Sequence, residues 1–121
     1  MPSRTYAPRS YLVRPTNFGR FQEVQWREVV GEQEADRLTA SQWQHFVAVA
    51  VRDSAQYLDK TLDRVAEETR VGKQQFWRMM RGDIVMQLED FAAMRRIFNI
   101  RLLSAQVDVE PRAGTQVEPG E

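Results

Sequence analysis

The chain has 121 residues, of which 42% are hydrophobic, and its net charge is zero, so its size and composition suit one domain with a modest core. It contains no cysteine and a single histidine, His45, which excludes disulfides, thiol catalysis and ordinary zinc sites. It has neither an apolar run long enough to span a bilayer nor an apolar secretory signal, so we expect a cytoplasmic protein that does not enter membranes.

Residues 1–17 are expected to form a flexible, extended basic arm. They contain three prolines, and the first 20 residues carry four arginines and no acid, which disfavours a helix. Arginines on such an arm suit the minor groove of DNA, so Arg4, Arg9 and Arg14 are candidate DNA contacts. A disordered leader and a strap across the surface of the domain are the alternatives.

Residues 18–37 fit a helix only in part, and Val24, Trp26 and Val30 also fit the alternation of a strand. We predict a helix because the acidic stretch from Glu28 to Asp36 favours one. So many carboxylates exclude this segment as a face for DNA.

The clearest long helix is predicted from Ser41, as its N-terminal cap, to Lys60. Its apolar stripe at helical spacing comprises Trp43, Phe46, Val47, Ala50, Ser54, Tyr57 and Leu58. Val49 and Val51 widen the apolar surface, which either residues 18–37 or a second subunit could cover. His45 lies off the stripe and is expected at an exposed or edge position.

Two short helices joined by a tight turn are predicted over residues 61–82. Thr61 can cap the first helix, whose buried positions Leu62, Val65 and Ala66 share one face. The second helix is expected from about 73 to 80, and its buried positions are Phe76, Met79 and Met80. Gly82 would end it.

The second helix of this pair has the composition of a DNA-reading helix. Residues 70–81 carry four basic side chains and no acid, which suits binding to phosphates. Gln74, Gln75 and Arg78 can form paired hydrogen bonds with base edges. Trp77 either packs against a neighbour or contacts the duplex.

A further amphipathic helix is predicted over residues 87–98. Its apolar face consists of Leu88, Phe91, Met94, Ile97 and Phe98. Residues 100–109 could form a short strand or a last helical turn. The acidic tail, residues 110–121, is rich in Pro, Gly and Glu and should be disordered.

Several positions in this region follow the pattern of one known family: Val65, Ala66, Val71, Phe76, Met79 and the pair Arg81–Gly82. With them, residues 61–100 resemble the helix-turn-helix core of the Cro/phage-repressor (Xre-like) DNA-binding domains. The resemblance implies base contacts from Gly72, Lys73, Gln74, Trp77 and Arg78. It also implies backbone contacts from Thr61, Lys73 and Arg81.

The chain departs from the family pattern at three positions. The family usually has glycine at the place of Arg70 and a small polar residue at the place of Gly72. Leu62 stands where many members carry a glutamine that binds phosphate.

These observations predict an all-α protein: a compact helical bundle over residues 18–109 with a helix-turn-helix core, the arm and the tail. The expected function is sequence-specific binding of double-stranded DNA by a homodimer, as a transcriptional regulator and repressor of bacterial or phage type. The alternatives are a helical protein-interaction module, such as an antitoxin-like adaptor, and an architectural or recombination accessory protein. We expect no catalytic residues, no cofactor, no metal and no small-molecule substrate.

Overall fold

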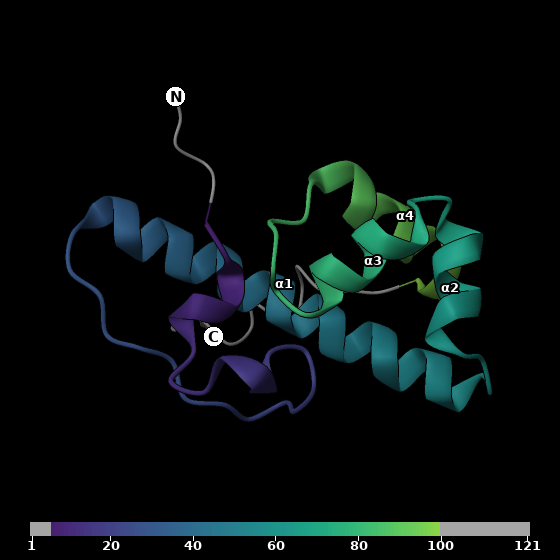
Figure 1. The fold of residues 1–121 in the computed structure, drawn as a ribbon, viewed down its shortest axis with the longest axis horizontal. Coiled ribbons are helices and arrows are strands. Elements are labelled where there is room, and N and C mark those ends of the chain that lie inside the picture. Colours follow the sequence, from purple (N-terminus) through teal and green to yellow (C-terminus); the bar gives the residue numbers. More distant parts are fainter. Residues whose placement is uncertain (1–5, 100–121) are drawn as a thin grey trace, which may run out of the picture.

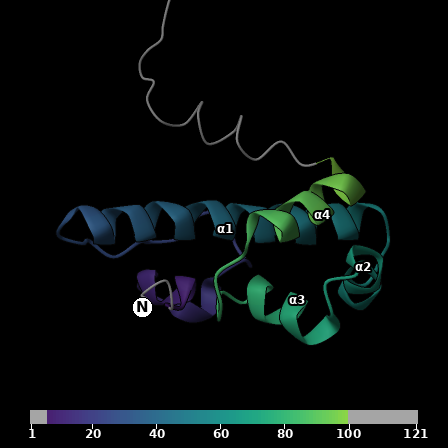
Figure 2. The same ribbon diagram turned by 90° about the horizontal axis from the view of Figure 1, so that it is seen from above.

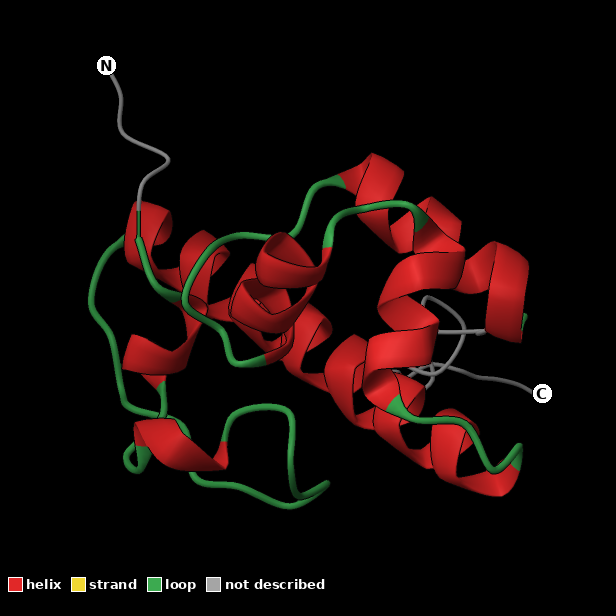
Figure 3. Cartoon of the chain, turned by 45° about the vertical axis from the view of Figure 1, so that its right-hand side comes forward, coloured by secondary structure: helices red, strands yellow, loops and turns green. Residues whose placement is uncertain are grey.

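The structure, a computed structural model, describes residues 6–99 of the chain. Arg4, the segment 100–109 and the acidic tail 110–121 therefore lie outside the described residues. Within residues 6–99 every regular element is a helix and no strand occurs (Figures 1 and 3), which confirms the all-α class. The elements are the 3-10 helices η1 (Pro8–Tyr11) and η2 (Pro15–Asn17) and the α-helices α1 (Glu32–Tyr57), α2 (Leu62–Thr69), α3 (Lys73–Met80) and α4 (Leu88–Phe98).

Helix α1 is one continuous element of 26 residues, and it begins nine residues before Ser41. The prediction of a separate helix over residues 18–37 is wrong, because only its last six residues are helical and they form the first turns of α1. Gly31, with φ +96°, precedes the helix, and Glu32 and Glu34 suit its positive end. Ser41 is no cap: it is buried inside α1, and its Oγ donates to the Arg37 carbonyl at 2.8 Å.

The buried face of α1 differs from the predicted apolar stripe. Trp43 is 40% exposed and Tyr57 is 88% exposed, although both were expected in the core. The buried positions include Val47 of the stripe and Val49 and Val51, which were expected to widen it. The others lay outside the predicted stripe: Ser41, Gln44, His45, Ala48 and Ala55. Because three of the buried residues of α1 are polar, the apolar spacing predicts a helix face that is rotated away from the face that packs.

Residues 6–17 form the strap that was the alternative to an extended arm. Leu12 and Phe18 are fully or almost fully buried, and both belong to the hydrophobic core. The Tyr11 hydroxyl donates to a Glu34 carboxylate oxygen at 2.8 Å, which ties the strap to α1. An antiparallel bridge joins Leu12 to Trp26, so the segment after the strap folds back along it.

The wide apolar surface of α1 is covered within the described chain. Val24 and Trp26 pack against the core, and Val49 and Val51 are buried within the chain itself. These two valines therefore offer no surface to a second subunit.

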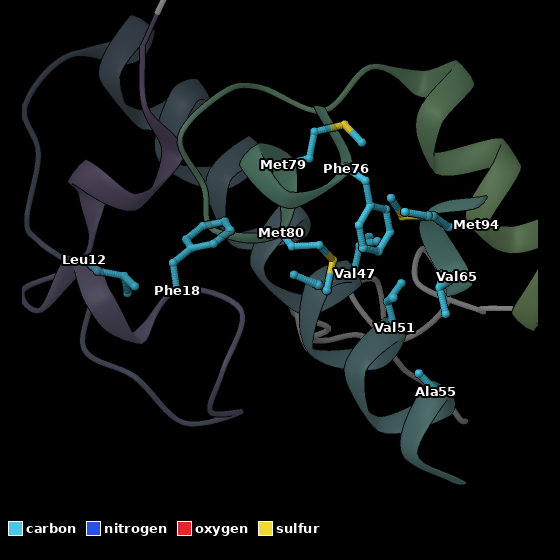
Figure 4. Close-up of a cluster of buried hydrophobic side chains, with 12 residues drawn as sticks. Leu12, Phe18, Val47, Val51, Ala55, Val65, Phe76, Met79, Met80 and Met94 are labelled. Atoms are coloured by element: carbon cyan, nitrogen blue, oxygen red, sulfur yellow. The ribbon is translucent and has the colours of Figure 1, made fainter. Parts of the chain in front are cut away.

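Helices α2, α3 and α4 lie close to their predicted positions. The core that joins them to α1 contains Val65 and Ala66 from α2, three residues of α3, and Met94 from α4 (Figure 4). Leu88 is an exception, because it is 84% exposed at the start of α4. In Figure 2 the N-terminal 3-10 helices, α3 and α2 follow one another along one side of α1, while α4 packs against α1 and α2.

Candidate nucleic-acid interface

A tight turn sets the direction of α3 relative to α2. Arg70 adopts the left-handed conformation with φ +62°, and Gly72 precedes α3 with φ +106°. The Thr69 hydroxyl donates to the Ala66 carbonyl at 2.8 Å and accepts the Val71 N–H at 3.3 Å, which closes the turn. Arg70 therefore takes the backbone conformation that a glycine would take at this place without steric cost.

Helix α3 is fixed from behind by its apolar residues. Phe76, Met79 and Met80 are completely buried, as the sequence predicted. Opposite them, Lys73, Gln74, Gln75 and Arg78 are exposed, together with Gly72 before the helix and Arg81 after it. A short helix held by its core face thus presents basic and amide side chains to solvent.

Trp77 lies between these two faces and is half-buried. Its indole N–H donates to Oδ1 of Asp63 in α2 at 2.9 Å, and Lys73 Nζ lies 3.2 Å from Oδ2 of the same carboxylate. The hydrogen bond from Trp77, followed by the interactions with Lys73, holds the pKa of Asp63 below its ordinary value. Residues 70–81 contain no acid, but the fold places Asp63 beside Lys73 and Trp77, which are two of the predicted DNA contacts.

A second carboxylate lies at the other end of α3. Arg81 donates from Nε and a terminal nitrogen to Oδ2 of Asp83, at 3.3 and 3.1 Å. Arg9 of the strap approaches Oδ1 of Asp83 at 2.7 Å, in an ion pair that lacks hydrogen-bond alignment. The structure thus brings Arg9 and Arg81, two predicted DNA contacts 72 residues apart in sequence, to one acid.

Gly82 is needed where the strap docks. The Arg9 N–H donates to its carbonyl at 3.0 Å, and its φ is +76°. A Cβ added there would lie 2.7 Å from ring atoms of Phe18, so a larger residue would displace the strap. This is a second role beside ending the helix, which was the role predicted from the sequence.

The remaining predicted contacts are dispersed. Thr61 is exposed and caps α2, its Oγ1 accepting the Arg64 N–H at 3.1 Å, as expected. Arg14 is exposed but lines a separate hollow with Asn17 and Glu23, so it is not grouped with α3.

Sequence reasoning missed Gln44, which positions the C-terminal end of α3. This buried side chain donates from Nε2 to the carbonyls of Met79 and Ile84, both at 2.9 Å, and accepts the Met86 N–H at 2.7 Å. One amide therefore satisfies three backbone groups where the chain leaves α3. A single glutamine between apolar residues gives no pattern from which this role could be read.

His45 is fully buried, which contradicts the expected exposed or edge position. Its Nδ1 accepts the Gly19 N–H at 2.9 Å, and its Nε2 lies 2.8 Å from the Phe21 carbonyl. Because Nδ1 accepts, the proton of the neutral ring belongs on Nε2 and is donated to Phe21. Burial lowers the pKa of His45, in keeping with a neutral ring that ties the folded-back segment to α1.

Residues 6–99 contain no group of three or more His, Cys, Asp or Glu side chains that could hold a metal ion. No helix in that range has both the length and the apolar character needed to cross a membrane.

No protein-family model, curated protein or solved structure matches this chain. The resemblance of residues 61–100 to the Cro/phage-repressor family thus stays a prediction, and the geometry of α3 and its surroundings is the remaining support for a function.

Proposed function

We propose that the protein is a sequence-specific double-stranded DNA-binding transcriptional regulator, a repressor of the bacterial or phage type that acts in the cytoplasm. The observation that carries the proposal is the two-sided character of α3. Three fully buried residues hold its inner face, while Lys73, Gln74, Gln75 and Arg78 are exposed along its outer face. Arginine and glutamine are side chains that read guanine and adenine edges in the major groove, and lysine suits phosphate.

One short recognition helix reads only a few base pairs, so specific binding generally needs two copies on a palindromic site. We therefore propose a homodimer that binds two half-sites. Occupancy of a promoter by such a dimer would repress transcription by blocking polymerase, with no catalytic step and no cofactor.

A helical protein-interaction module, such as an antitoxin-like adaptor, is the second candidate. It is favoured by Asp63, whose carboxylate engages both Trp77 and Lys73 and places negative charge beside the proposed reading face. In that case Trp77 and Arg78 would contact a protein partner rather than a duplex.

The deciding experiment is selection of bound duplexes from a random pool by the full chain, followed by competition with random duplex. A repressor should enrich a palindromic motif and retain it against competitor. Retention without any enriched motif would instead support an architectural protein. Failure to retain any duplex at low salt would reject DNA binding and leave the interaction module.

A further inference from the structure

A cleft of about 350 Å³ lies where the strap meets α1 and the C-terminal end of α3. Four arginines line it, and they come from segments far apart in sequence: Arg9 and Arg20 from the N-terminal region, Arg52 from α1 and Arg81 after α3. Thr16 and Trp77 are among its other lining residues, and no carboxylate of residues 6–99 lines it. The fold therefore assembles a cationic cleft that no local charge run predicts.

Arg52 is the cleft arginine with a buried donor atom that no acceptor among residues 6–99 meets. Its Nε is buried and makes no hydrogen bond, and its guanidinium carbon lies 6.0 Å from the centroid of the Trp77 ring. Burial, and then repulsion from Arg20, lowers the pKa of Arg52, so the charged form is poorly stabilised as it stands. A buried donor on a charged group without an acceptor is costly, and an anion in the cleft beside the guanidinium would offset part of that cost through its charge.

The carboxylates that pair with residues of the cleft leave most of this positive charge uncompensated. Asp83 is shared between Arg9 and Arg81, so one acid serves two guanidinium groups. Asp63 is engaged by Trp77 and Lys73 on α2 and α3, and it does not line the cleft. Arg20 and Arg52 therefore face the cleft without a carboxylate of their own among its lining residues.

The geometry points to a phosphate-binding site formed by Arg9, Arg20, Arg52 and Arg81. Guanidinium groups match the oxygens of a phosphoryl group in charge and in bidentate geometry, and the Thr16 hydroxyl adds a further donor at the rim. Two sources could supply the phosphate. One is a backbone phosphodiester of a duplex lying on α3, which rests on the proposed function; the other is a free phosphorylated solute, which does not.

The test titrates the full chain with inorganic phosphate and pyrophosphate and follows the Arg52 Nε–H and Trp77 Nε1–H signals by NMR. Binding should saturate and should shift both signals. Arg52→Gln should weaken pyrophosphate binding about tenfold or more, since a hydrogen bond to a charged group is lost. Arg95→Gln in α4 removes the same charge outside the cleft and should leave it nearly unchanged.

A second arm compares random-duplex binding by the same two variants over a range of salt. If the cleft holds a duplex phosphate, Arg52→Gln should reduce the salt slope by about 0.9 relative to Arg95→Gln. Equal slopes together with a lost pyrophosphate site would assign the cleft to a free solute. Saturable pyrophosphate binding by a protein that binds no duplex would reject the proposed function and still support the cleft.

The exposed Arg20 provides a variant, Arg20→Gln, that does not disturb a buried group, so a folding defect of Arg52→Gln would not obscure the result. If neither variant differs from Arg95→Gln in pyrophosphate binding or in duplex binding, the cleft is not a phosphate site.

Discussion

Asp63 in α2 accepts the indole N–H of Trp77 in α3 at 2.9 Å, and the same carboxylate lies 3.2 Å from Lys73 Nζ. The hydrogen bond between Trp77 and Asp63 joins α3 to α2 at the surface, in addition to the buried residues that the two helices share in the core. It also means that Trp77 is oriented before any partner arrives, whereas Lys73 shares its charge with an acid. The Asp63 carboxylate therefore fixes the orientation of the Trp77 ring, and its negative charge would repel a phosphate that approached Lys73.

Replacing Asp63 with asparagine should strengthen duplex binding about two- to fivefold, the range expected for an exposed charge pair. The amide oxygen can still accept the Trp77 indole N–H, while Lys73 becomes free to contact phosphate. Affinity is measured by fluorescence anisotropy with the selected duplex at fixed salt. Asp36→Asn, an equal change of charge at an exposed site on α1, is the control, and equal affinities of the two variants would show that Asp63 does not face DNA.

Arg78 is the exposed arginine of α3, and no ion pair to it is present among residues 6–99. If it reads a base, Arg78→Ala should cost about 1–3 kcal/mol on the cognate duplex and relax specificity at one position. Binding to the selected duplex and to its single-base variants is measured in parallel. Arg95→Ala on α4 is the matched control, and an unchanged preference at every base position would remove Arg78 from base reading.

His45 gives the fold a dependence on pH. Because burial lowers its folded-state pKa below the ordinary 6.5, the unfolded chain takes up the proton first as pH falls. The contribution of the neutral ring to the free energy of unfolding is complete above about pH 6.5 and is lost as the pH falls through the folded-state pKa. Each unit by which the folded-state pKa lies below the unfolded-state value corresponds to about 1.4 kcal/mol. Protonation of Nδ1 would also set it against the Gly19 N–H that it now accepts.

Urea unfolding between pH 8 and 5 measures this effect, together with an NMR titration of the imidazole. Carboxylates stabilised in the fold, such as Asp63 and Glu68, lose their contribution only near or below their ordinary values of 3.8 and 4.5, so they do not mask the window of His45. His45→Gln should have a flatter profile over the same range. An imidazole that titrates at or above pH 6.5 in the folded protein would contradict the argument.

The sequence predicted the elements whose signals are local. The spacing of Val65, Ala66, Phe76 and Met79 placed α2 and α3 within a residue or two, and Thr61 caps α2 as expected. Helical periodicity and capping depend on neighbours three or four residues apart, so they survive in a single sequence.

The errors concern polar residues that the tertiary structure buries. Gln44 and His45 belong to the core face of α1 because each satisfies backbone groups of distant segments. No pattern within α1 indicates those hydrogen-bond partners, and the apolar spacing predicted Trp43 and Tyr57 as core residues, although both are exposed. Arg20 and Arg52 were missed for a related reason, since they lie 32 residues apart in sequence and only the fold brings them to one cleft.

Gln44→Met should destabilise the protein by about 3 kcal/mol. Methionine keeps the unbranched shape, but the carbonyls of Met79 and Ile84 and the N–H of Met86 lose their partner. Urea unfolding measures the loss, with Gln56→Met, at an exposed position of α1, as the control. Equal stability of the two variants would mean that water replaces the amide at no cost.

Arg70 carries the last prediction, which concerns the turn before α3. As a residue with a Cβ at φ +62°, it pays a steric cost that glycine would not pay. We expect Arg70→Gly to be about 1 kcal/mol more stable than Arg70→Ala. The two variants remove the same charge, so their difference isolates the backbone conformation from the loss of the guanidinium. Urea unfolding of both variants supplies the number, and an alanine variant as stable as the glycine variant would show that the turn does not require the left-handed conformation.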